Sequence, residues 1–326
     1  MRVRELLKAF LSAWATAAIL TAGGAALAAT KSEPGKITDA THGQGSPSPA
    51  LWKIVNGKST VYFLGSIHLL PEGFSWHTPA IDKAIKAADA FVFEADLDFG
   101  TAEFHYYMDN YGYLPRGQTL HQMLSPAAQK QYFTLIRDMQ IDLNKLDYLQ
   151  PGLAVLLLDR AFIGTHASRP LEPGVDAQLV YYAKSHAKEL HYLESLQSQF
   201  DVLAKIGGGA QAAVLEKKLL SREKNTGEFG TMVAAWVKGD LPKLISMDDM
   251  DPKERILTLD NRNRAWQPKI EAMLEDGRTY LVTVGTAHLA GPNSVISLLC
   301  AKHWKLERIQ TGSTPPPPAC ADDRKS

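Results

Sequence analysis

The chain has 326 residues, with 35 Lys and Arg against 35 Asp and Glu, 45% hydrophobic residues and two cysteines. The balanced charge, with no contiguous basic stretch, excludes the electrostatic signature of a nucleic-acid-binding protein. The composition is globular rather than disordered, and two cysteines exclude both a disulfide-rich scaffold and a CxxC metal site.

Residues 1–28 predict an export signal. Basic residues precede an apolar, alanine-rich run from Phe10 to Ala28, and Ala26-Leu27-Ala28 matches the small-x-small rule of signal peptidases. The alternative is an uncleaved membrane anchor, but Gly23-Gly24 and the cleavage site favour removal. We therefore expect a periplasmic or secreted protein, with no stable membrane span once the signal peptide is cleaved.

The mature chain divides into three parts. Residues 29–50 are rich in Gly, Ser and Pro and predict a flexible leader, and residues 311–326, which include four consecutive prolines, predict an extended tail. One folded domain is expected over residues 51–310. Within it, residues from about 101 to 276 are largely helical by period and form an insertion between two β-rich ends.

The two ends of the domain follow the same pattern. In each, an apolar strand runs into Gly-x-x-His-Leu, at Gly65 to Leu69 and at Gly285 to Leu289, and a helix and another strand follow, which indicates an internal half-repeat. The first end also carries an Asn56-Gly57 hairpin signal. The predicted strands of the two ends are Leu51–Val55, Thr60–Leu64, Ala90–Phe93, Thr279–Val284 and Lys305–Ile309, and the helices are Pro79–Ala88 and Ser294–His303.

The insertion predicts one short strand, Leu190–Leu193, and a series of helices. These helices are Ala102–Tyr111, Pro126–Met139, Gly152–Phe162, Val175–Ser185, Gln197–Ile206, Gln211–Arg222, Gly227–Lys238, Leu241–Ser246 and Pro252–Glu275. The expected fold is α/β of mixed type: a central β-sheet built from two strand–Gly-x-x-His–helix–strand halves, with the helical insertion as a cap over one sheet edge.

Polar side chains follow three of the predicted strands. His68 and His288 end the Gly-x-x-His motifs, and Glu94 follows the strand Ala90–Phe93. Ligands of open α/β sheets bind outside the carboxyl ends of the strands, so we expect these side chains to meet at one sheet edge. Two imidazoles and a carboxylate suit a divalent metal with open positions for water and substrate. The alternative is a pair of structural histidines and a surface glutamate.

These segments resemble the TraB/GumN family, which is related to the Tiki metalloproteases. The resemblance covers Leu51 to Ile309 and includes further motifs between the two ends. Those motifs are Phe93-Glu94-Ala95-Asp96, Gly117-Gln118-Thr119-Leu120, Gly174-Val175-Asp176-x-Gln178-Leu179, Leu193-Glu194-Ser195-Leu196-x-x-Gln199, Ala235-Trp236-x-x-Gly239-Asp240 and Arg262-Asn263-Arg264-x-Trp266. The wider superfamily includes erythromycin-esterase-like and haem-binding ChaN-like proteins.

The resemblance implies a metal-dependent peptidase with His68, Glu94 and His288 at the metal. The expected ion is divalent, namely manganese, cobalt or zinc. One departure concerns the family pattern Leu-Glu-Thr-x-Glu-Glu-Gln, of which only the first acid is present here, as Glu194.

Three residues of the insertion are candidate catalytic residues. Glu194 follows the strand Leu190–Leu193 and is the candidate general base, with an N-cap of the next helix as the alternative. Arg262 and Asn263 lie in a long polar helix. The resemblance makes Arg262 a candidate to bind a carbonyl oxygen or a carboxylate, and a solvated helix face is the alternative. Asp176 stands at a predicted helix start, where a capping role is expected.

Two functions follow from this reading. The first is an exported metal-dependent hydrolase, most simply a peptidase, that acts on a peptide or small-molecule substrate. The second is a non-catalytic binding protein of the same fold for a ligand, haem or metal, with a link to polysaccharide biosynthesis or export as an association only. The two differ in whether a base lies within reach of the attacking water.

The two cysteines lie close together near the carboxyl terminus. Export would permit a disulfide between Cys300 and Cys320 that fixes the proline-rich tail. The alternative is two free thiols, with Cys300 buried in a helix.

Overall fold

The computed structural model describes residues 47–96, 98, 100–166, 170–205, 209–221, 228–247, 250, 252–309 and 320. The predicted signal peptide, nearly all of the leader and the tail other than Cys320 lie outside these described residues.

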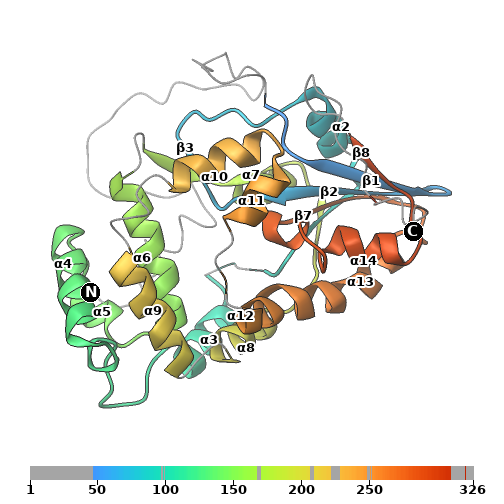
Figure 1. Ribbon diagram of the computed structural model, residues 1–326. Helices are drawn as coiled ribbons and strands as arrows, with labels where there is room; N and C mark the ends of the chain where they lie inside the picture. Colours follow the sequence, from blue (N-terminus) through green and yellow to red (C-terminus); the bar gives the residue numbers. More distant parts are fainter. Residues whose placement is uncertain are drawn as a thin grey trace, which may run out of the picture.

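A six-stranded mixed sheet is the centre of the fold (Figure 1). Its strand order is β6-β4-β7-β2-β1-β8, and the strands are β1 (Leu51–Asn56), β2 (Ser59–Ser66), β4 (Ala90–Phe93), β6 (Glu189–Tyr192), β7 (Thr279–Gly285) and β8 (Leu306–Ile309). The adjacent strands β6, β4, β7 and β2 are parallel, whereas β1 is antiparallel to both of its neighbours. The predicted mixed α/β class is confirmed.

The two Gly-x-x-His strands are neighbours. β2 pairs in parallel with β7, so that Gly65 lies opposite Val284 and Ser66 opposite Gly285. Because parallel strands end at the same edge of a sheet, both motifs leave the sheet side by side. This is the arrangement that the shared pattern of the two ends predicts.

Helices cover both faces of the sheet, which explains why its central strands carry apolar side chains on both faces. Val61 and Val282 pack into the core on one face, and Leu64 and Leu281 pack into the core on the other, as the period of two requires. The first face is covered by α13 (Asn261–Met273) and α14 (Val295–Ala301), and the second by α2 (Pro79–Ala87), α7 (Val175–Ser185) and α10 (Glu228–Val237).

A third core is built almost entirely from helices of the insertion. Phe104, Tyr132 and Leu215 are among its buried residues. The helices of this part are α3 (Ala102–Tyr111), α4 (Pro126–Asp138), α5 (Leu143–Leu146), α6 (Pro151–His166), α8 (Leu196–Lys205) and α9 (Gly209–Ser221). In Figure 1, α4, α5, α6 and α9 stand together beside the sheet. The predicted helices agree with these bounds to within a few residues, apart from α5, which was not predicted, and from α6, which continues to His166.

Two features of the structure differ from the sequence prediction. A second, two-stranded sheet pairs β3 (Leu69–Pro71) with β5 (Leu171–Pro173), and three-residue strands are too short to show an alternating pattern. The predicted helix Pro252–Glu275 is divided into α12 (Pro252–Arg255), a π-helix (Ile256–Asp260) and α13. The helix α11 (Leu241–Ser246) and the 3-10 helix His121–Met123 complete this part.

None of the helices in the described part of the chain combines the length and the apolar character needed to cross a bilayer.

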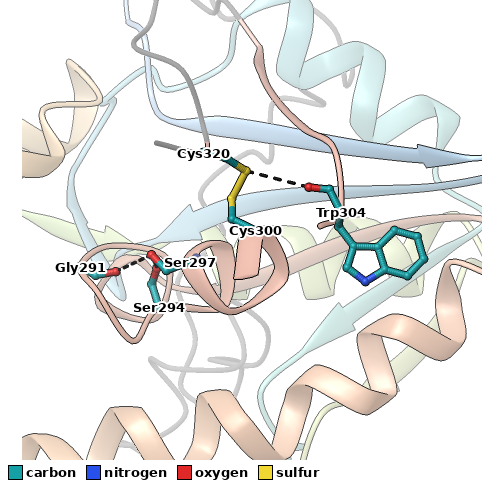
Figure 2. The surroundings of a disulfide bond; sticks show 6 residues. All are labelled: Gly291, Ser294, Ser297, Cys300, Trp304 and Cys320. Carbon is teal, nitrogen blue, oxygen red and sulfur yellow. Dashed lines mark hydrogen bonds between the residues drawn. A yellow bond between two sulfur atoms is a disulfide. The ribbon is translucent and has the colours of Figure 1, made fainter. Parts of the chain in front are cut away.

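A disulfide joins Cys300, in α14, to Cys320 (Figure 2). The two Cα atoms are 5.6 Å apart, and the sulfur of Cys320 also contacts the carbonyl of Trp304 at 3.9 Å. The interpretation as a disulfide is therefore confirmed over that of two free thiols. The bond ties residue 320 to the sheet domain.

Removal of this disulfide should lower the stability of the fold. Closure of a loop with a sequence separation of 20 is worth about 3 kcal/mol. We expect Cys320→Ser to lower the free energy of unfolding by about 3 kcal/mol. In urea denaturation followed by circular dichroism, this appears as a lower midpoint. Dithiothreitol should lower the wild-type midpoint and leave that of Cys320→Ser unchanged. An equal response of both proteins to the reductant would contradict this role.

Gly174 should be intolerant of any side chain. A Cβ at this position would lie 1.8 Å from the carbonyl oxygen of Ile67, so the backbone after β2 would have to move. We expect Gly174→Ala to cost on the order of 3 kcal/mol in the free energy of unfolding. Gly230→Ala is the matched control, because Gly230 lies within α10 with nothing within 4 Å of its added Cβ, and it should stabilise by about 0.5 kcal/mol.

Candidate functional site

The four polar side chains predicted to follow strands gather at the carboxyl edge of the parallel strands. Glu94 follows β4, Glu194 follows β6 by two residues, and His68 and His288 follow β2 and β7. Backbone pairing continues past the ends of β4 and β6, because the N–H of Glu194 donates to the carbonyl of Glu94 at 2.8 Å. Glu94 and Glu194 are therefore paired residues on the two neighbouring segments that follow β4 and β6.

His288 is buried and held in one tautomer. It lies in the short 3-10 helix Thr286–His288 and is 3% exposed. Its Nε2 lies 3.0 Å from the Nη1 of Arg262, which can only donate, so Nε2 accepts and Nδ1–H donates to the Oδ1 of Asn263 at 2.6 Å. Burial, together with Arg262, lowers the pKa of His288 to about 3 against the attraction of Glu94. The imidazole is neutral at physiological pH.

Glu94 is held as a carboxylate. Its Oε1 accepts from the backbone N–H of Gly285 at 2.8 Å, and its Oε2 accepts from the Nη2 of Arg262 at 2.5 Å. Oε1 also lies 3.8 Å from the Nε2 of His288. Burial alone would raise the pKa of Glu94, but neighbouring positive charge and the Gly285 N–H lower it to about 2. Since His288 is neutral, we attribute the lowering mainly to Arg262.

Arg262 joins Glu94 to Glu194. Its Nε donates to both oxygens of Glu194, at 2.9 and 3.2 Å, and its Nη2 donates to the Oε1 of Glu194 at 2.5 Å. The Arg262 side chain is only 12% exposed, so the alternative of a solvated helix face is wrong. Arg262 also lies over the ring of Trp266, with its guanidinium carbon 4.8 Å from the ring centre.

Glu194 is surrounded by donors. Besides Arg262, the Nε1 of Trp266 donates to its Oε2 at 3.2 Å, and the Nε2 of Gln199 donates to its Oε1 at 2.6 Å. The hydroxyl of Ser195, not Glu194, accepts from the first turn of α8, at the N–H of Ser198. The N-cap alternative for Glu194 is therefore wrong. Trp266 and Gln199 belong to two of the motifs that resemble the family, but nothing in the sequence indicates that they donate to Glu194.

The π-helix before α13 helps to position Arg262. In a π-helix the N–H of residue i+5, not of residue i+4, bonds to a carbonyl, as Asn261 does with Ile256. The carbonyl of Thr258 instead accepts from the Nη1 of Arg262 at 3.0 Å. The same Nη1 reaches His288, so the local widening of the helix fixes the guanidinium between its partners.

The turn after β2 is anchored from two sides. The indole Nε1 of Trp236 donates to the carbonyl of Gly65 at 2.9 Å, and the hydroxyl of Thr286 donates to the carbonyl of Ser66 at 2.9 Å. A Cβ on Gly65 would lie 2.7 Å from the Thr286 hydroxyl oxygen, which accounts for the glycine of this motif. These contacts fix the backbone just before His68.

His68 lies at the open side of the site, and its partner is Asp176. Its Nδ1 is 3.2 Å from the Oδ2 of Asp176, and the imidazole side chain is 44% exposed. Partial removal of the ring from water would lower the pKa of His68, but the carboxylates of Asp176 and Glu94 outweigh it and raise the pKa. Gly174 is the N-cap of α7, so the predicted capping role of Asp176 is wrong: it stands in the first turn and faces His68.

The chemistry of these residues suits a divalent ion, although their present placement does not assemble a site. Both imidazoles direct Nδ1 to an oxygen, as histidines that bind metals through Nε2 commonly do, and here the Nε2 of His288 accepts from Arg262. Two buried atoms, Asp176 Oδ1 and Ser66 Oγ, find no hydrogen-bond partner among the described residues, which fits a site that takes up another polar group. Within that part of the chain, no three His, Cys, Asp or Glu side chains are close enough to hold an ion. Arg262 is the cation beside Glu94 and His288.

The fold and the site together describe one class of protein: an α/β sheet covered by helices, with two Gly-x-x-His turns after neighbouring parallel strands. The chain belongs to the TraB/PrgY/gumN family, whose model matches residues 50–308. Relatives include the uncharacterized protein YbaP of Escherichia coli (strain K12) and that of Shigella flexneri, each 25% identical over 258 residues that cover 77% of this chain and 92% of the relative. No solved structure matches the chain.

The ionised state of Glu94 should make stability depend on acid. A carboxyl group whose pKa is lowered on folding, here from 4.5 to about 2, contributes stability that is complete above pH 4.5 and is lost as the pH falls towards 2. We expect wild-type protein to be more stable than Glu94→Gln at neutral pH by on the order of 3 kcal/mol. The difference should shrink below pH 4.5, as followed by chemical denaturation at a series of pH values.

Glu275→Gln is the control for this measurement, because Glu275 is an exposed acid beyond the end of α13. Its difference from the wild type should stay small at every pH. A gap between wild type and Glu94→Gln that does not narrow in acid would show that Glu94 is not held as an anion.

Proposed function

We propose that the protein is an exported hydrolase that uses a divalent metal ion, namely manganese, cobalt or zinc, held by His68, Glu94 and His288, to cleave a peptide or another small molecule. The observation that carries this proposal is the convergence of His288 and Glu94, with Nε2 and Oε1 3.8 Å apart at the edge where α/β sheets bind ligands. The relation of the family to the Tiki metalloproteases supports the peptidase part.

Export is proposed on two grounds. The signal-like residues 1–28 predict it, and the disulfide between Cys300 and Cys320 is a bond that persists in oxidising compartments. Both fit a periplasmic or secreted protein that acts on material outside the cytoplasm.

The roles of the surrounding side chains follow from their contacts. Asn263 fixes His288 with Nε2 as its acceptor nitrogen, and Asp176 orients His68 in the same way. Gly285 N–H and Arg262 fix Glu94 as a carboxylate. An ion held by this set would polarise a substrate carbonyl and lower the pKa of a water molecule.

Glu194 is the residue on which the choice between a hydrolase and a binding protein depends. As the proposed general base it must accept a proton, yet its oxygens already accept from Arg262, Trp266 and Gln199. These contacts favour a positioning role for Glu194 and so keep a second function open. In that function the protein binds a ligand, haem or metal at the same edge without turnover.

The test is to measure metal content and peptide hydrolysis for four variants of the mature protein supplied with saturating manganese, cobalt or zinc. His68→Ala, His288→Ala and Glu94→Gln should lose bound metal, because each removes a ligand. If Glu194 is the base, Glu194→Gln should retain metal and lose about 100-fold or more in turnover.

Full activity of Glu194→Gln would return Glu194 to a purely structural role. Retention of stoichiometric metal by His68→Ala would remove His68 as a ligand. If the parent protein binds metal but hydrolyses no peptide or ester, the binding function replaces the hydrolase.

A further inference from the structure

Arg262 makes two kinds of contact that are chemically distinct. It holds Glu194 through Nε and Nη2 and the carbonyl of Thr258 through Nη1. It also donates to Glu94 Oε2 through Nη2 and to His288 Nε2 through Nη1. The first group anchors the guanidinium within its own region. The second uses the atoms that the proposed function assigns to a metal ion.

Those atoms cannot serve both partners. A neutral imidazole nitrogen of the acceptor type has one lone pair, and the Nε2 of His288 directs it at Arg262. A divalent ion and the guanidinium are also both cations, so they repel each other when they share Glu94. Occupation of Nε2 by an ion therefore requires the contact with Arg262 to break.

We propose that Arg262 is a resident counter-cation that competes with a divalent ion for Glu94 and His288, and that Glu194 retains the guanidinium when the ion displaces it. This inference rests on the proposed function. The anchoring contacts to Glu194 and to the Thr258 carbonyl use other acceptors than Glu94 and His288, so the side chain can give up Glu94 and His288 and keep Glu194 as its charged partner. In this role Arg262 controls the affinity of the site for the ion.

The charge balance supports this role. Glu94 and Glu194 are carboxylates with side chains only 21% and 8% exposed, and Arg262 is the cation between them. Two buried carboxylates on neighbouring strand ends need a cation nearby, because an unpaired buried charge is costly. Either the guanidinium or a divalent ion meets that need at Glu94, which is why one can replace the other.

Isothermal titration of chelator-treated mature protein with manganese or zinc, at one fixed pH, tests the competition. Arg262→Gln should bind the ion about tenfold or more tightly than wild type, because no charge-assisted hydrogen bond has to be broken. Arg264→Gln is the matched control: it removes the same charge from the same helix at an exposed position, where Arg264 bonds only to Asn261 among the contacts described for it. Its affinity should equal that of wild type.

Thermal unfolding gives a second readout that needs no activity. In chelator, Arg262→Gln should melt below both wild type and Arg264→Gln, since its two carboxylates lose their cation. Added ion should raise its melting temperature more than that of wild type. If Arg262→Gln does not fold, Arg262→Lys replaces it, because an ammonium keeps the charge and cannot span both acids and His288. It too should bind more tightly than wild type.

The possible results separate this inference from the proposed function. If wild type binds the ion and the Arg262 variants bind it equally or more weakly, the competition is wrong but the proposed metal site is retained. Absence of ion binding in every protein, the folded Arg262 variants included, overturns both. If Arg264→Gln also binds the ion more tightly than wild type, the gain in affinity comes from the lower net charge of the protein, and the specific role of Arg262 is wrong.

Discussion

The fold at the carboxyl edge of the sheet depends on one guanidinium between two carboxylates. Glu94 and Glu194 follow adjacent parallel strands and are joined there by a backbone hydrogen bond, so their negative charges are forced together. Neither is well exposed, and two unpaired buried anions would oppose the pairing of β4 with β6. Arg262 removes that conflict, and α13 must therefore lie where its side chain can reach both strand ends.

The position of α13 then determines the rest of the site. Trp266 is four residues after Arg262, so both lie on the same helix face and both contact Glu194. Asn263 is the next residue in the helix, so its side chain points in a different direction and contacts His288 rather than Glu194. The π-helix directly before α13 sets this rotation and supplies the Thr258 carbonyl to the guanidinium. A shift of one residue in this segment would separate all three side chains from their partners.

The sequence was sufficient for the parts that depend on local pattern. Apolar strands that run into Gly-x-x-His predicted that β2 and β7 are neighbours, and the placement of Glu94 after β4 followed from the same logic. The roles of Asp176 and Arg262 could not be predicted, because each depends on which residue faces it across the fold: Asp176 resembled a helix cap, and Arg262 lay in a polar helix. The pairing of β3 with β5 and the π-helix leave no periodic signal either.

Stability alone does not account for charged residues at this edge. Removing one partner of a buried ion pair is strongly destabilising, but replacing the whole set by apolar residues of similar volume is often neutral or better. The sheet is otherwise covered on both faces by apolar cores, so a fold of this kind has no need of Arg262, Glu94 and Glu194 together. What the charged set adds is a carboxylate and an oriented imidazole nitrogen 3.8 Å apart at the edge where α/β sheets in general bind ligands. An apolar set would supply neither, and this is the physical reason to regard the cluster as functional.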